Sequence, residues 1–195
     1  MQKTVTGIYG GSFNPIHNGH LAIASAMVEQ GEVDEVWLMV SPQNPLKQSA
    51  GLLDEQMRLD MTRRAVETVQ HVTACDYEFR LPRPSYMWHT LQSLSRDYKD
   101  REFCLLIGAD NWAVFDRWYH AEDIISHYPI RIYPRRGYDI DTQRLPASVK
   151  LVDTGLYDIS STMVRERIAK GEDISGLVPE CIREAALSAY KNKMP

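Results

Sequence analysis

Apolar residues gather in six short runs, separated by longer segments of mixed polarity. The second run, Val36–Val40, contains no polar residue, as expected of a strand that is covered on both faces of a sheet. Turn residues such as Pro42 and Pro45 follow this run and end it. The pattern predicts strands at residues 5–9, 36–40, 71–75, 103–107, 130–133 and 150–152.

The segments between these runs have the spacing of amphipathic helices. After Asp54 and Glu55, an apolar residue recurs at every fourth position from Met57 to Val69. Gly31 closes an earlier segment, as glycine does at the C-terminus of many helices. The spacing predicts helices at residues 19–30, 54–69, 86–94, 121–125, 161–169 and 179–191.

Predicted strands and helices alternate along the chain. This order predicts an α/β fold with a doubly wound parallel sheet and helices on both of its faces. The 195 residues suit one well-buried domain and are too few for two ordinary ones. We therefore expect a single domain over residues 1–195, in which residues 160–195 form a C-terminal helical part.

The composition excludes several classes of protein. A net charge of −4 argues against a broad nucleic-acid-binding surface. No apolar run approaches the roughly 18 residues that a membrane span needs. Residues 1–4 lead directly into the first strand, so no signal peptide is expected. Cys75, Cys104 and Cys181 are odd in number and widely spaced, which predicts free thiols in a cytoplasmic protein.

The segment from Gly10 to His20 follows the first predicted strand and carries the strongest chemical signal. Gly10 and Gly11 lack a Cβ atom, so the chain can turn tightly and bring backbone N–H groups close to a ligand. Asn18 is a candidate N-cap of the next helix, whose N-terminus favours anions. His17 and His20 project from one turn and can donate hydrogen bonds or carry positive charge near neutral pH. Together these features predict a phosphate-binding cradle, whereas the glycine pair alone would predict only a turn.

A second polar segment, Ser160–Arg167, opens a later predicted helix. Serine and threonine at such a position cap helices, and the same hydroxyl and N–H groups can bind phosphate. Arg165 lies one turn into this helix, near the same end, whereas Arg167 is expected on its surface. Capping alone would explain the serines, so this segment acquires a phosphate-binding interpretation only in combination with the first.

At these residues the chain resembles the nucleotidyltransferases that carry the motifs G-G-x-F-x-P-x-H-x-G-H and I-S-S-T-x-x-R. The first motif is matched, with Ser12 at a variable position, by Gly10, Gly11, Phe13, Pro15, His17, Gly19 and His20. The second is matched by Ile159, Ser160, Ser161, Thr162 and Arg165. The resemblance implies a Rossmann-like fold in which His17, His20 and Arg165 are catalytic. It also implies that the phosphates of ATP are bound by Gly10, Gly11, Ser12, Phe13, Gly19, Ile159, Ser160, Ser161 and Thr162.

Two further segments resemble those of the bacterial nicotinate mononucleotide adenylyltransferases. Ser85, Tyr86 and Met87 resemble the family's P-S-Y-T segment, with methionine in place of threonine. Trp118 and Tyr119 resemble its W-Y pair. The resemblance implies that all five residues bind the mononucleotide. Trp118 would stack on the pyridine ring, which suits an indole face, and the Tyr119 backbone would help to hold the nicotinate carboxylate.

The same resemblance implies that four more residues bind ATP or its phosphates. Gly108 and Asp110 resemble the family's G-x-D segment, where a carboxylate suits ribose hydroxyls or a metal-bound phosphate. An N-cap role would explain Asp110 equally well. Lys47 resembles the end of the P-P-H-K segment, with leucine in place of the histidine, and Arg135 resembles the start of R-P-G-Y, with arginine in place of the proline.

The implied reaction moves AMP from ATP to nicotinate mononucleotide, giving nicotinate adenine dinucleotide and pyrophosphate. The acceptor phosphate attacks the α-phosphate, so catalysis depends on positioning and charge stabilisation. Mg²⁺ is expected with ATP, held largely by substrate phosphates and waters. Three alternatives stay open at this point. The chain could adenylylate nicotinamide mononucleotide or phosphopantetheine, use CTP on an alcohol phosphate, or sense a nucleotide without chemistry.

Overall fold

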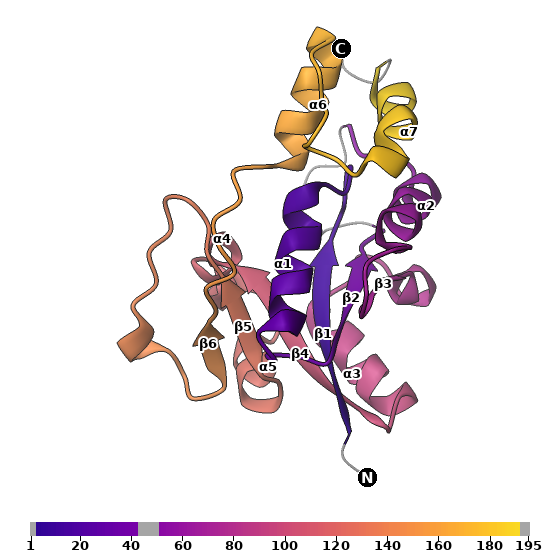
Figure 1. The fold of residues 1–195 in the computed structure, drawn as a ribbon. Helices are drawn as coiled ribbons and strands as arrows, with labels where there is room; N and C mark the ends of the chain where they lie inside the picture. The colour runs from indigo at the N-terminus through magenta and orange to yellow at the C-terminus, as the bar shows by residue number, and fades with distance from the viewer. Residues whose placement is uncertain (1–2, 43–50, 192–195) are drawn as a thin grey trace.

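Six parallel strands form one sheet in the computed structural model, which describes residues 3–42 and 51–191 (Figure 1). The strand order is β3-β2-β1-β4-β5-β6, and every neighbouring pair is parallel. This confirms the α/β class and the doubly wound parallel sheet. The strands are β1 (Thr4–Gly11), β2 (Glu35–Val40), β3 (Val72–Cys75), β4 (Arg101–Gly108), β5 (Ile130–Tyr133) and β6 (Val149–Leu151).

The six predicted helices are present, with ends that shift by a few residues. They are α1 (Asn18–Glu29), α2 (Glu55–Val66), α3 (Met87–Asp97), α5 (Ala121–His127), α6 (Ser161–Lys170) and α7 (Glu180–Tyr190). The sequence did not predict the short helices α4 (Ala109–Trp112), η1 (Tyr77–Arg80), η2 (Phe115–Arg117) and η3 (Thr142–Arg144). Within residues 3–42 and 51–191, no helix combines the length and apolar character needed to cross a bilayer.

Helices cover both faces of the sheet, and a hydrophobic core lies on each face. In β4, Leu106 packs into one core and Leu105 into the other, because successive side chains of a strand point to opposite faces. The first core is completed by α1, α2, α6 and α7, and the second by α3, α4 and α5. Burial on both sides explains why Val36–Val40 has no polar position.

The strand order reverses next to β1, which lies between β2 and β4. In an open α/β sheet, ligands bind outside the carboxyl ends of the strands at such a switch point. Figure 1 shows α6 and α7 at the end of the molecule opposite the N-terminus, beyond the carboxyl end of β1. The fold therefore brings the N-terminal glycine and histidine motif and the Ser160–Arg165 motif to one edge of the sheet.

Candidate active site

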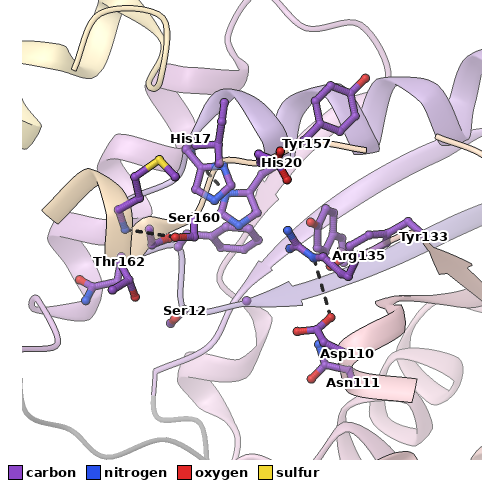
Figure 2. A pocket seen from close by; sticks show the side chains of 18 of the residues that line it. Ser12, His17, His20, Asp110, Asn111, Tyr133, Arg135, Tyr157, Ser160 and Thr162 are labelled. Carbon is purple, nitrogen blue, oxygen red and sulfur yellow. Dashed lines mark hydrogen bonds and ion pairs between the residues drawn. The ribbon is translucent and has the colours of Figure 1, made fainter. Parts of the chain in front are cut away.

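Two cavities open at this edge and meet at the end of β1. The larger has a volume of about 910 Å³ and the smaller of about 320 Å³. Both are lined by Gly10, Gly11 and Ser12, and by Asn111 and Tyr133. Figure 2 shows side chains around the larger cavity, with Ser160 and Thr162 on one side and Arg135, Asp110 and Asn111 on the other.

Gly10 and Gly11 lie within β1, so the prediction that they form the turn was wrong. A Cβ atom on Gly10 would lie 2.9 Å from Met87 Cε, and one on Gly11 would lie 2.9 Å from the Phe13 ring. Phe13 itself makes the turn, with a φ of 42°. Gly11 therefore leaves room for the Phe13 ring, and the left-handed backbone belongs to this buried phenylalanine.

His17 and His20 stack against each other at the start of α1. Their ring centroids are 3.5 Å apart at an interplanar angle of 22°. The His17 backbone N–H donates to His20 Nδ1 at 3.2 Å, and the Phe13 ring packs edge-on to His20 with centroids 5.0 Å apart. A Cβ atom on Gly19 would lie only 3.1 Å from His17 Nδ1, so this glycine leaves room for the His17 ring.

His17, and not Asn18, is the N-cap of α1, which corrects the sequence prediction. The Asn18 side chain is used elsewhere, because its Nδ2 donates to the carbonyl oxygen of Gly176 at 2.7 Å. The backbone N–H of Asn18 also donates to Leu177 at 2.8 Å. Asn18 therefore fastens the start of α1 to the connection between α6 and α7.

The charge expected on His17 near neutral pH is also corrected. Burial, assisted by the positive charge of Arg135, lowers the pKa of His17 to about 3. In the described part of the chain, His17 Nδ1 is buried and has no hydrogen-bond partner. His17 thus offers a neutral imidazole to a ligand in the larger cavity.

This low pKa predicts that His17 makes folding stability depend on pH. The unfolded chain binds a proton at this residue below about pH 6.5, whereas the folded chain does not bind one until about pH 3. The stabilisation is complete above pH 6.5, and it falls by about 1.4 kcal/mol per pH unit as the pH decreases from 6 to 4. The free energy of unfolding of His17→Gln, measured with urea at each pH, should therefore fall less steeply with decreasing pH than that of the wild type, by about 1.4 kcal/mol per pH unit.

The matched control for this measurement is His127→Gln, because His127 is an exposed histidine on α5. It should follow the wild-type slope. Equal slopes for His17→Gln and the wild type would contradict the assignment of a neutral His17.

The Ser160–Arg165 segment contacts the first motif directly. Ser160 is the N-cap of α6, and its Oγ accepts from the Met163 N–H at 3.1 Å. Ser161 Oγ donates to the Pro15 carbonyl at 2.8 Å. Arg165 donates from Nη1 to the Asn14 carbonyl at 2.7 Å and from Nη2 to Thr162 Oγ1 at 3.2 Å. Ser160 therefore caps its helix while the residues after it join two motifs that are about 150 residues apart in sequence.

Asn14 links four parts of the chain, a role that no motif in the sequence predicted. Its Oδ1 accepts from the Leu53 N–H at 3.1 Å and from Tyr190 Oη at 2.6 Å. Its Nδ2 donates to Gly51 at 3.1 Å, and its carbonyl accepts from Arg165. The asparagine is 6% exposed. In sequence, an asparagine beside a proline indicates only a turn. The neighbouring residues therefore could not reveal that Asn14 bonds to distant parts of the chain.

Arg58 holds the segments that follow β1 and β2, and no sequence pattern predicted this role. Its side chain is fully buried and donates to four carbonyl oxygens, those of Ser12 at 2.6 Å, Ser41 at 2.8 Å, Leu53 at 2.8 Å and Pro42 at 3.2 Å. These bonds join the segments that follow β1 and β2 to the start of α2. A buried arginine with carbonyl partners gives no pattern in the sequence, where it reads as one more charge on an amphipathic helix.

The opposite side of the larger cavity holds Asp110 and Arg135. Arg135 Nε lies 3.8 Å from Asp110 Oδ1, which is an ion pair longer than a hydrogen bond. A Cβ atom on Gly108 would lie 2.2 Å from Asp110 Oδ1, so only glycine allows this carboxylate to turn back toward β4. Gly108, and not Asp110, is the N-cap of α4, so the N-cap interpretation of Asp110 was wrong.

The smaller cavity brings together all five residues that were predicted to hold the mononucleotide. Ser85, Tyr86 and Met87 come from the start of α3, and Trp118 and Tyr119 follow η2. The Tyr86 and Tyr119 rings lie 4.9 Å apart. The Trp118 ring packs on Phe115 at 5.0 Å, which holds the indole at the wall of the cavity.

Most of the residues predicted to bind nucleotide phosphates also line the larger cavity. These are Gly10, Gly11, Ser12, Phe13, His17, His20, Asp110, Arg135, Ile159, Ser160, Ser161, Thr162 and Arg165. Gly19 and Gly108 act through the space that they leave for His17 and Asp110. Lys47 lies outside the described residues. Lining residues that the sequence analysis did not single out include Asn111, Tyr133, Tyr138, Tyr157 and, in the smaller cavity, Glu78 and Arg117.

Comparison with known proteins identifies similar sequences over most of the chain. Residues 8–167 match the cytidylyltransferase-like family. A relative from Bacteroides fragilis (strain YCH46), named "Probable nicotinate-nucleotide adenylyltransferase", is 49% identical over 174 residues. This match covers 89% of the chain and 87% of the relative. A relative of the same name from Flavobacterium johnsoniae is 39% identical over 180 residues, covering 91% of the chain and 93% of the relative.

A solved structure with the same fold is the Plasmodium falciparum nicotinic acid mononucleotide adenylyltransferase complexed with NaAD. The two structures align with a TM-score of 0.77, covering 96% of this chain and 98% of the other, at 18% sequence identity. At that identity the comparison supports the fold, which is the one expected from the two motifs.

Proposed function

The chain belongs to the cytidylyltransferase-like family and, within it, to the nicotinate-nucleotide adenylyltransferases, and we propose on that basis how its two cavities divide the reaction. The protein transfers AMP from ATP to nicotinate mononucleotide, a step of NAD biosynthesis. In the proposal the larger cavity binds ATP and the smaller binds the mononucleotide. Free thiols at Cys75, Cys104 and Cys181 are compatible with the cytoplasm as its proposed location.

One observation supports this assignment of ATP and the mononucleotide to separate cavities. The cavities meet at Gly10–Ser12, so ligands in both would approach each other over the end of β1. The larger one is bordered by stacked imidazoles and by the hydroxyl and guanidinium groups of α6, which suit phosphates. The smaller one is bordered by tryptophan and tyrosine rings, which suit a flat heteroaromatic ring.

In the proposed mechanism, a phosphate oxygen of the mononucleotide attacks the α-phosphorus of ATP. The new bond forms as the bond from the α-phosphorus to the β-bridging oxygen breaks, and pyrophosphate leaves with the electron pair. His17 and His20 donate hydrogen bonds to the α-phosphoryl oxygens as charge builds on them. Ser161, Thr162 and Arg165 hold the leaving pyrophosphate. No side chain becomes covalently modified.

Mg²⁺ would enter as part of the ATP substrate. The described residues contain no group of three histidine, cysteine or acidic side chains that could hold a metal. The carboxylates that line the larger cavity are Asp110 and Asp158. This sparse donor set suits an octahedral ion that keeps most of its bonds to phosphates and waters.

Pyrophosphate release from ATP tests the proposal directly. The protein is incubated with Mg·ATP and, in separate reactions, with nicotinate mononucleotide, nicotinamide mononucleotide or phosphopantetheine; a further reaction combines CTP with an alcohol phosphate. We expect release to be fastest with nicotinate mononucleotide. Faster release in any other reaction would reassign the substrates. ATP binding without release in any reaction would favour a nucleotide sensor.

Trp118→Ala tests the assignment of the smaller cavity. Loss of the indole face removes ring stacking worth about 1 kcal/mol and the apolar contact around it, so the KM for nicotinate mononucleotide should rise by about tenfold or more. The KM for ATP should change little. Trp37→Ala, on β2, is the matched control, because Trp37 lines neither cavity and packs on Tyr98 and Phe103. A change confined to the KM for ATP would exclude Trp118 from the acceptor site.

A further inference from the structure

The smaller cavity contains a buried acidic side chain to which the proposed mechanism gives no role. Glu78 lies in η1 and is 3% exposed, and it lines the cavity together with Ser85 and Trp118. Thr90 of α3 donates from Oγ1 to Glu78 Oε1 at 2.9 Å. Thr90 is itself one helical turn after Tyr86, whose carbonyl oxygen lies 3.3 Å from the same hydroxyl. Glu78 is therefore held against the start of α3, where the predicted acceptor site begins.

The charge of the smaller cavity depends on this one side chain. Among the described residues that line it, Glu78 is the only carboxylic acid and Arg117 is the only basic residue. With Glu78 protonated, the lining carries the single positive charge of Arg117. With Glu78 ionised, the two charges cancel and a carboxylate stands at the cavity wall.

We propose that Glu78 is a specificity-determining residue, whose side chain sets how readily the smaller cavity accepts an anionic substituent on the bound ring. The proposal rests on the proposed function, because it concerns the acceptor of that reaction. Nicotinate carries a carboxylate where nicotinamide carries a neutral amide. In a partly desolvated cavity, an ionised Glu78 repels the nicotinate carboxylate, and this repulsion lowers the affinity for nicotinate mononucleotide. The amide experiences no such repulsion.

Burial raises the pKa of Glu78, and the hydrogen bond from the Thr90 hydroxyl opposes this rise. The neutral acid thus persists to a higher pH than an exposed glutamate would allow. At a pH where Glu78 is still neutral but an exposed glutamate would be ionised, the nicotinate carboxylate is already ionised. Raising the pH through the pKa of Glu78 should therefore act on the acid substrate and leave the amide unaffected.

Of the titratable and charged groups on the surrounding elements, His89 borders the smaller cavity through two tyrosines that line it, and the others are engaged elsewhere. Arg80 lies over the Tyr77 ring at 4.3 Å, and Asp76 pairs with Arg63 at 2.9 Å. On α3, the His89 ring contacts Tyr86 and Tyr119. On β2, Glu35 pairs with Arg101. Among the described groups, the Thr90 hydroxyl therefore contacts Glu78 directly, and Arg117 lines the same cavity.

The test is the ratio of kcat/KM for nicotinate mononucleotide to kcat/KM for nicotinamide mononucleotide, measured over the whole pH range in which the protein stays folded. Both substrates carry the same phosphate, so its titration cancels in the ratio. In the wild type we expect the ratio to fall by about tenfold over this range. In Glu78→Gln it should stay high and independent of pH. Glu67→Gln, an exposed glutamate at the end of α2, should follow the wild type.

Thr90→Val provides a second readout if Glu78→Gln fails to fold. It removes a hydrogen bond that favours the ionised carboxyl, so the fall in the ratio should move to higher pH. A ratio that is flat in the wild type, or that falls equally in Glu78→Gln, would overturn the role of Glu78. Absence of pyrophosphate release with either mononucleotide would instead overturn the proposed function.

Discussion

Replacing His20 with alanine should lower kcat by about 10²- to 10³-fold while the KM for ATP changes by less than about threefold. His20 Nδ1 accepts a hydrogen bond from the His17 N–H, so the neutral ring carries its proton on Nε2. A donor placed in this way strengthens its bond to a phosphoryl oxygen as negative charge develops in the transition state. Steady-state kinetics with Mg·ATP and nicotinate mononucleotide measures both constants.

The control for this variant is His127→Ala. His127 is an exposed histidine on α5 and lines neither cavity, so its removal should leave kcat within about twofold of the wild type. An equal loss of kcat and of ATP affinity in His20→Ala would show that the ring contributes to binding in the ground state, and it would exclude the transition-state role.

Replacing Arg58 with methionine should destabilise the fold by about 3 kcal/mol, because four carbonyl oxygens lose a charged donor in a buried site. For a chain of this size the corresponding fall in Tm is about 6–12 °C. The KM for ATP should rise as well, since Arg58 fixes the carbonyl of Ser12 beneath the larger cavity. Differential scanning calorimetry and steady-state kinetics measure the two effects.

Arg63→Met is the matched control, because Arg63 lies on the same helix with a half-exposed side chain. Its ion pairs with Asp60 and Asp76 lie at the surface, where such pairs contribute about 0–1 kcal/mol. Arg63→Met should therefore change the Tm by less than about 4 °C. If both variants had the same Tm, the four hydrogen bonds of Arg58 would have no net effect on stability.

The layered fold could be predicted because its signal is local. A strand that is buried on both faces must be apolar at every position, as Val36–Val40 is, and such runs alternate visibly with helical spacing. The meeting of the two motifs was implied by the family resemblance, and the sheet supplies its physical reason. Parallel strands end at one edge, and residues that follow different strands meet there.

The internal support of the site could not be predicted, because it depends on contacts between distant segments. Asn14 and Arg58 bind carbonyl and hydroxyl groups from several elements, and none of these partners is adjacent in sequence. The charge of His17 was predicted wrongly for a related reason. A sequence gives the residue type, whereas the pKa is set by burial and by Arg135, which lies more than 100 positions away.

The bond from Tyr190 Oη to Asn14 Oδ1 has a consequence for the order in which the protein becomes active during its synthesis. Asn14 is translated well before its partners on α6 and α7, which lie 151 and 176 positions later in the sequence. A nascent chain halted before α6 would have the histidine pair without the groups that hold pyrophosphate. ATP retention by ribosome-bound chains of increasing length should therefore begin only after α7 has left the exit tunnel.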